Sequence, residues 1–119
     1  MSQPEHRRAA RFIRAFVVRY QAFGAKSDAW LTSTLRNFSS VGARFLSGQP
    51  FRMGETIVLQ LLLPTSRQPI VLKARVVWNK PGSLGSMDIG VEFEPTELAA
   101  RKAISDAAQF FLRKQREAS

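Results

Sequence analysis

Residues 70–78 read IVLKARVVW, and this stretch indicates the fold class of the chain. Apolar residues occupy every second position from Ile70 to Trp78, while Lys73 and Arg75 fall between them. A period of two is the repeat of a β-strand that buries one of its faces. The pattern therefore predicts a strand over residues 70–78, with Trp78 in register with the inward row.

Five further segments carry strand patterns and are separated by residues that favour turns, such as glycine, proline, serine and asparagine. They are residues 12–20, 29–36, 41–46, 55–63 and 88–94. In the last segment the apolar residues are expected to face inward, and the acidic residues Asp88, Glu92 and Glu94 outward.

The periodicity changes near residue 95, and residues 96–116 predict a helix. Thr96 suits the N-cap, Glu97 suits the positive end of the helix dipole, and apolar residues then recur at helical spacing up to Phe111. Six short strands followed by one amphipathic helix predict an all-β fold, a six-stranded antiparallel β-barrel with one C-terminal α-helix. We expect one domain over residues 1–119: a mobile basic segment (1–11), the barrel (12–94) and the helix (96–116).

The composition narrows the function classes. The chain has 119 residues, no cysteine and a single histidine, His6. It therefore has few of the side chains that bind metals or act in nucleophilic catalysis. Carboxylates are scattered, and no phosphate-cradling glycine loop is visible. The sequence also shows no apolar run long enough to cross a bilayer and no signal peptide. We expect a non-enzymatic binding module, without metal or cofactor, located in the cytoplasm.

The charge of the chain favours an anionic partner. Eighteen Lys and Arg residues against nine Asp and Glu residues give a formal net charge of +9 and a pI near 11.3. Arginines are concentrated near the N-terminus and are opposed there by Glu5 alone: Arg7, Arg8, Arg11, Arg14 and Arg19. Arginine is suited to planar, bidentate contacts with phosphates and guanine edges. A solvated basic terminus without a ligand is the alternative interpretation.

Two short motifs stand out. The first is an R-x-x-x-R pattern from Arg7 to Arg11, which alone is expected by chance in a chain so rich in arginine. The second is N-x-S-x-x-G, formed by Asn37, Ser39 and Gly42. It could be a simple turn, with the two polar side chains bonding to backbone and Gly42 adopting an unusual φ. The order basic segment, strand, turn, strand, then this motif is more specific than either pattern alone.

This arrangement resembles the PilZ domain, a family that binds the bacterial second messenger cyclic di-GMP. The resemblance covers nearly the whole chain. Besides the two motifs, three stretches carry it: Phe51-Arg52-Met53-Gly54, Ala74-Arg75-Val76-Val77-Trp78, and Gly90-Val91-Glu92-Phe93 before the helix. The family implies a six-stranded barrel whose arginine segment folds over a ligand that lies on the barrel surface.

The chemistry of the motif residues suits such a ligand. Arg7 and Arg11 can donate to guanine O6 and N7 or to phosphate oxygens, and their planes can stack on a purine. Asn37 and Ser39 can bond a guanine edge or a phosphate, and Gly42 allows a close approach. Many family members have aspartate where this chain has Asn37, so an altered affinity is expected. The resemblance adds Arg8 as a further contact, Trp78 as a stacking wall and Gly90 as part of the floor, although core packing competes for Trp78.

The sequence therefore predicts a bacterial, cytoplasmic cyclic di-GMP receptor that changes conformation on binding and signals to a partner protein. The resemblance implies a partner in motility, adhesion or secretion machinery. Two alternatives stay open. One is a PilZ-fold interaction adaptor that binds no cyclic di-GMP. The other is a basic barrel that binds nucleic acid generally, which would show steep salt dependence and little base preference.

Overall fold

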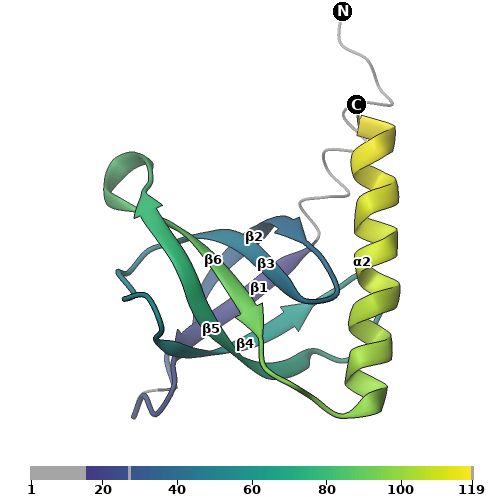
Figure 1. Cartoon of the computed structure of the whole chain (residues 1–119), viewed down its shortest axis with the longest axis horizontal. Coiled ribbons are helices and arrows are strands. Elements are labelled where there is room, and N and C mark those ends of the chain that lie inside the picture. Colours follow the sequence, from purple (N-terminus) through teal and green to yellow (C-terminus); the bar gives the residue numbers. More distant parts are fainter. Residues whose placement is uncertain (1–15, 27, 119) are drawn as a thin grey trace, which may run out of the picture.

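The computed structural model describes residues 16–26 and 28–118. Six strands precede one long helix (Figure 1). The elements are β1 (Val17–Ala22), β2 (Leu31–Phe38), β3 (Gly42–Ser47), β4 (Thr56–Leu62), β5 (Ile70–Pro81), the short 3₁₀ turn η1 (Ser83–Gly85), β6 (Met87–Phe93) and α2 (Leu98–Ala118). The predicted fold class is thus confirmed, and each predicted strand corresponds to an observed one with ends displaced by a few residues, although the predicted start of the first strand lies outside the described residues.

The strands close into a barrel in the order β1-β2-β3-β6-β5-β4, with every neighbouring pair antiparallel. Strand alternation places one row of each strand inside, and the interior is filled by large apolar side chains such as Tyr20, Phe45 and Leu59. In β5 the predicted inward row is confirmed from Ile70 to Val76, all of it buried. Within the part of the chain that the structure describes, no helix is long and apolar enough to cross a membrane.

Helix α2 covers one side of the barrel (Figure 1). Its predicted stripe is confirmed, because Ile104, Ala107, Ala108 and Phe111 are buried. The ring of Phe111 meets the ring of Phe16 edge-on, with centroids 4.8 Å apart. Phe111 therefore joins the helix to the start of β1.

The start of the helix differs from the prediction. The helix begins at Leu98, and the carbonyl of Glu97 accepts the hydrogen bond from the amide of Arg101, at 2.9 Å. Glu97 thus holds the N-cap position predicted for Thr96, because the cap is the residue whose carbonyl accepts the first helical bond. The hydroxyl of Thr96 instead donates to the carbonyl of Glu97 at 3.5 Å.

The structure differs from the sequence prediction at two side chains. Trp78 was predicted in the inward row, but it lies on the outer face and is 36% exposed. Asp88 alternates with the core residues Ile89 and Val91 and so faces outward as predicted, yet its side chain is buried. Both residues lie at the same patch of the barrel surface.

Candidate functional site

Two β-bulges determine which side chains reach this patch. In the pairing of β2 with β3, Leu35 lies opposite Phe45 and Asn37 lies opposite Arg44, so Arg36 is an extra residue. A bulge shifts the alternation of the strand by one residue. Asn37 is therefore exposed and its neighbour Phe38 is buried. If the alternation continued from Leu35 without a bulge, Asn37 would face inward like Leu35.

The second bulge lies in β5. Val76 is opposite Val91 and Trp78 is opposite Gly90, so Val77 is the extra residue. The insertion turns Trp78 away from the core that Val76 enters. This is the physical reason why the period-two prediction failed at Trp78.

The registers of four strands align one row of residues across the outer face. Asn37 of β2 lies opposite Arg44 of β3, Arg44 lies opposite Gly90 of β6, and Gly90 lies opposite Trp78 of β5. Directly opposite residues in antiparallel strands have Cβ atoms about 4.5–5.5 Å apart. Three predicted site residues are thus brought into one row, and Arg44 is its fourth member.

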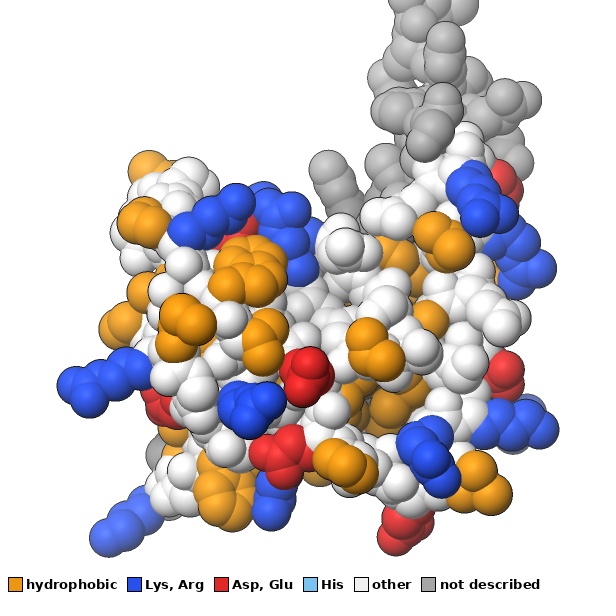
Figure 2. Space-filling model, in the orientation of Figure 1, with side chains coloured by type: hydrophobic (Ala, Val, Ile, Leu, Met, Phe, Trp, Pro, Cys, Tyr) orange, Lys and Arg blue, Asp and Glu red, His pale blue; other side chains and the backbone are white. Residues whose placement is uncertain are grey.

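A shallow pocket of about 170 Å³ lies along this row. All five predicted site residues within the described chain line it: Asn37, Ser39, Gly42, Trp78 and Gly90. Arg44 and Val77 also contribute to its wall. On the barrel side of the molecule, basic and hydrophobic side chains lie beside one another (Figure 2).

The turn between β2 and β3 is built by Ser39. Its hydroxyl oxygen accepts hydrogen bonds from the amides of Val41 and Gly42, both at 3.2 Å, and its amide donates to the Gly42 carbonyl at 2.9 Å. The Asn37 Oδ1 atom accepts from the Phe38 amide at 2.9 Å. Both polar residues of the motif therefore bond to backbone, as the turn interpretation requires.

Gly42 is required by close packing. The turn interpretation expected an unusual φ, but the positive-φ glycines of the described chain are Gly24, Gly54 and Gly85. A Cβ atom at position 42 would instead collide with the backbone carbonyl oxygen of Val91 on β6. Gly42 allows the start of β3 to approach β6, and this approach forms one end of the pocket.

Gly90 has a similar role beneath Trp78. A Cβ atom at position 90 would clash with the indole ring of Trp78, including Cδ1 at 2.8 Å. The ring therefore lies against the glycine, over the surface of β6. Two cations approach the ring: the Arg44 guanidinium is 5.9 Å and the Lys80 ammonium 5.6 Å from its centroid.

Arg44 is held by Asp88. The Arg44 Nη2 donates to the Asp88 Oδ2 at 2.7 Å, and Nε donates to Oδ1 at 3.1 Å and Oδ2 at 3.2 Å. The side chain of Asp88 is only 5% exposed, whereas that of Arg44 is 38% exposed. The arginine covers the carboxylate, which explains why an outward-facing aspartate is buried.

Asp88 is held in its ionised form. The hydrogen bond from Arg44 lowers the pKa of Asp88, burial acts in the opposite direction, and the charges of Arg44, Lys80 and Arg36 lower the pKa further. A lowered folded-state pKa stabilises the fold above the ordinary aspartate pKa, near 3.9, and this stabilisation is lost as the pH falls through the folded-state value.

Asp88→Asn should therefore change the pH dependence of stability. We expect the free energy of unfolding of the variant to be lower than that of the wild type at pH 6, with a difference that shrinks toward pH 2.5. Urea unfolding followed by circular dichroism at a series of pH values measures it. A difference that stays constant over this range would contradict the role of the ionised carboxylate.

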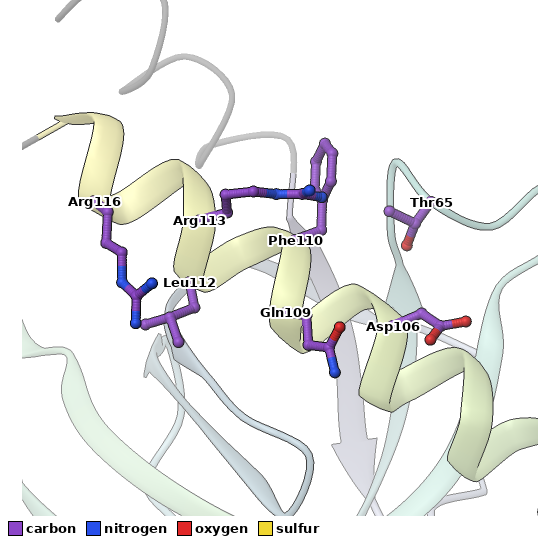
Figure 3. A pocket seen from close by; sticks show the side chains of 7 residues that line it. All are labelled: Thr65, Asp106, Gln109, Phe110, Leu112, Arg113 and Arg116. Carbon is purple, nitrogen blue, oxygen red and sulfur yellow. The ribbon is translucent and has the colours of Figure 1, made fainter.

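A larger hollow of about 510 Å³ lies against α2 (Figure 3). The Arg113 side chain extends to Phe110 there, with its guanidinium carbon 5.4 Å from the ring centroid. Asp106 and Arg116 give the rim both charges, and none of the predicted site residues lines it. The smaller pocket on the barrel is the candidate site because it gathers those residues.

Sequence reasoning missed Arg44 and Asp88. Arg44 alternates with the buried residues Ala43 and Phe45, so its outward direction could be predicted from the sequence. In a chain so rich in arginine, however, no local pattern identified it as a site residue. The predicted contacts Arg7, Arg8 and Arg11, and the predicted mobile segment 1–11, lie outside the described residues. Among the described residues, no group of three or more His, Asp or Glu side chains could hold a metal ion.

The chain belongs to the PilZ domain family, which matches residues 5–109. Its fold is similar to that of the inhibitor of motility MotI/DgrA of Bacillus subtilis (TM-score 0.64, 18% identity, covering 87% of this chain and 48% of that one). It is also similar to that of MrkH of K. pneumonia in its apo state (TM-score 0.63, 13% identity, covering 87% of this chain and 50% of that one). A third similar structure is the PilZ domain of Escherichia coli YcgR with c-di-GMP (TM-score 0.56, 10% identity, covering 87% of this chain and 83% of that one).

The chain spans about half the length of the MotI and MrkH structures. No curated protein sequence matches it.

Proposed function

We propose that this protein is a non-catalytic receptor for cyclic di-GMP that transmits binding to a partner protein. The observation that carries the proposal is the cross-strand row, which brings Asn37, Gly90 and Trp78 to one pocket on the outer face. The PilZ family membership supports it, as does the similar YcgR domain, whose structure holds c-di-GMP.

The pocket suits one guanine of the ligand. The exposed indole of Trp78 offers a face for stacking, and base stacking on an aromatic ring contributes about 1–3 kcal/mol. The Asn37 Oδ1 is engaged with the Phe38 amide, while its Nδ2 has no hydrogen-bond partner among the described residues. That amide can donate to guanine O6 or N7. Ser39 and Gly42 shape the edge of the pocket, since the serine hydroxyl is used by the turn.

The basic N-terminal segment completes the proposed site. A pocket of about 170 Å³ is smaller than the roughly 300–1,000 Å³ that encloses a drug-sized ligand, so the barrel covers only part of the messenger. Arg7, Arg8 and Arg11 would supply donors to its phosphates and exposed guanine edges. Ligand charge would thus draw this segment onto the barrel and change the surface offered to a partner. Machinery for motility, adhesion or secretion is the expected class of partner.

Isothermal titration with cyclic di-GMP tests the proposal. We expect saturable binding, micromolar or tighter, by the wild type, and affinity at least about 100-fold lower for Arg7→Ala/Arg11→Ala, because two charge-assisted contacts are lost. Arg67→Ala/Arg101→Ala removes the same charge from exposed positions away from the pocket and should bind like the wild type.

Two outcomes would overturn the receptor proposal, and a third would overturn the role of the N-terminal arginines. A folded wild-type barrel that gives no heat with cyclic di-GMP would favour the interaction adaptor that binds no messenger. Tight, strongly salt-dependent binding of single-stranded nucleic acid, without preference for cyclic di-GMP, would favour the general nucleic-acid-binding barrel. Equal affinity of the two double variants would remove the N-terminal arginines from the site.

A further inference from the structure

We infer that Arg44 is a ligand-binding arginine supplied by the barrel itself, and that Asp88 is the positioning residue that fixes it beside Trp78. The inference rests on the proposed function, because it adds a contact to the same pocket. The donor of this added contact comes from a strand of the barrel, whereas the arginine contacts of the proposed function come from the basic N-terminal segment.

The pair with Asp88 leaves most of the guanidinium free for a ligand. Asp88 accepts from Nε and from Nη2 of Arg44. An arginine has five N–H groups, so the two N–H groups on Nη1 and the second on Nη2 are not used by this pair. One N–H group on Nη1 and the second on Nη2 form the terminal edge of the guanidinium, next to the edge that binds the carboxylate. A fixed, planar donor edge of this kind matches a phosphate or the O6 and N7 atoms of guanine.

The row geometry places the Arg44 side chain at the pocket. Arg44 is the direct neighbour of both Asn37 and Gly90, and its side chain lines the pocket. Gly90 has no side chain, so nothing at that position separates Arg44 from Trp78, whose ring centroid is 5.9 Å from the guanidinium carbon. A base stacked on Trp78 would bring its polar edge or its phosphate within reach of Arg44.

The Arg44–Asp88 pair differs from an ordinary surface ion pair. Arg75 and Glu92 also pair across β5 and β6, but through one contact of 3.4 Å with both side chains more than half exposed. Such exposed pairs contribute little and form no fixed geometry. Asp88 is buried, and replacing both members of a buried ion pair by apolar residues of similar volume is often neutral for stability. What the buried carboxylate does provide is one fixed orientation for Arg44 at the pocket wall.

A double-mutant cycle on affinity tests the inference. Cyclic di-GMP is titrated into the wild type, Arg44→Gln, Asp88→Asn and the double variant. We expect Arg44→Gln to weaken binding by about 10- to 100-fold, the value of one or two contacts to a charged group. Asp88→Asn should weaken it by a smaller factor and should have no further effect when Arg44 is already glutamine. This non-additivity identifies a residue that acts through another.

The matched control is Arg75→Gln, which removes a paired arginine from the outer face of β5, outside the pocket lining, and should bind like the wild type. A readout without ligand is acrylamide quenching of Trp78 fluorescence in a Trp30→Phe background. Arg44→Gln and Asp88→Asn should both increase the quenching, because the Arg44 guanidinium, one of the two cations near the indole, is removed or no longer held there. Gly90→Ala, whose Cβ atom displaces the ring, sets the upper limit of the change.

The outcomes separate the inference from the proposed function. A folded wild type that binds no cyclic di-GMP overturns both. A wild type that binds, with Arg44→Gln binding equally well, overturns only the role of Arg44. Asp88→Asn that weakens binding equally in the presence and absence of Arg44 overturns the positioning role. An analogue of cyclic di-GMP that lacks guanine N7 shows whether Arg44 binds the guanine edge or a phosphate. If Arg44→Gln causes a smaller loss of affinity for the analogue than for cyclic di-GMP, the arginine binds the guanine edge. If the loss of affinity is the same for both ligands, the arginine binds a phosphate.

Discussion

Gly42→Ala should lower the stability of the barrel by about 3 kcal/mol, at the upper end of the cost of overpacking. The added Cβ atom would overlap the carbonyl oxygen of Val91, and both groups belong to the backbone of paired strands. No rotamer change can relieve the overlap, so β3 and β6 must separate at this end. The expected fall in Tm is roughly 10–15 °C, measured by thermal unfolding followed by circular dichroism.

Gly48→Ala is the matched control for this prediction. Its new Cβ atom would meet only the Tyr20 hydroxyl oxygen, at 3.8 Å, which is an ordinary contact. Its free energy of unfolding should stay within about 0.5 kcal/mol of the wild type. If Gly42→Ala unfolds at the temperature of the wild type, the close approach of β3 to β6 is not needed, and the packing explanation for this glycine fails.

Among truncations to alanine in the helix, Phe111→Ala should have the largest effect, a loss of about 3–5 kcal/mol in the free energy of unfolding. The ring is fully buried and meets Phe16 at 4.8 Å and Phe38 at 6.1 Å, so it connects α2 to the start of β1 and the end of β2. Its removal leaves a cavity at the junction that holds the helix to the barrel. Urea unfolding measures the change through the midpoint and the slope.

Leu112→Ala is the control for this prediction. Leu112 is the next residue along the helix and is 48% exposed, so its truncation should cost less than about 1 kcal/mol. Similar losses for the two variants would mean that burial at the aromatic junction does not determine how firmly α2 is held. A selective loss for Phe111→Ala would assign the junction to the three rings.

The order of strands and helix was predictable because local periodicity determined it. Residues 70–76 alternate without interruption, and the helix stripe through Ile104 and Phe111 repeats at helical spacing. Strand ends were less accurate: β5 runs to Pro81, because its pairing with β6 continues through Lys80 and Asp88. A local pattern does not contain the partner that extends a strand.

The motif residues of the site were predictable, but their orientation was not. Asn37, Ser39 and Gly42 were found from their spacing, whereas the outward turn of Trp78 depends on one extra residue in β5 that looks like any other valine. Asp88 looked solvent-exposed because its partner Arg44 lies 44 positions away. Only the register of β3 against β6 brings the two together.

The two bulges also bear on how such a surface tolerates changes of length over generations. Arg36 and Val77 are each one extra residue, and each lies immediately before a residue of the pocket. Loss of the single codon for Val77 would remove the bulge, and Trp78 would then directly follow the inward-facing Val76 and stay opposite Gly90 on the outer face. A three-nucleotide deletion at the bulge can thus leave the aromatic surface in place, whereas a one-residue deletion in a regular part of a strand moves the side chains beyond it to the other face.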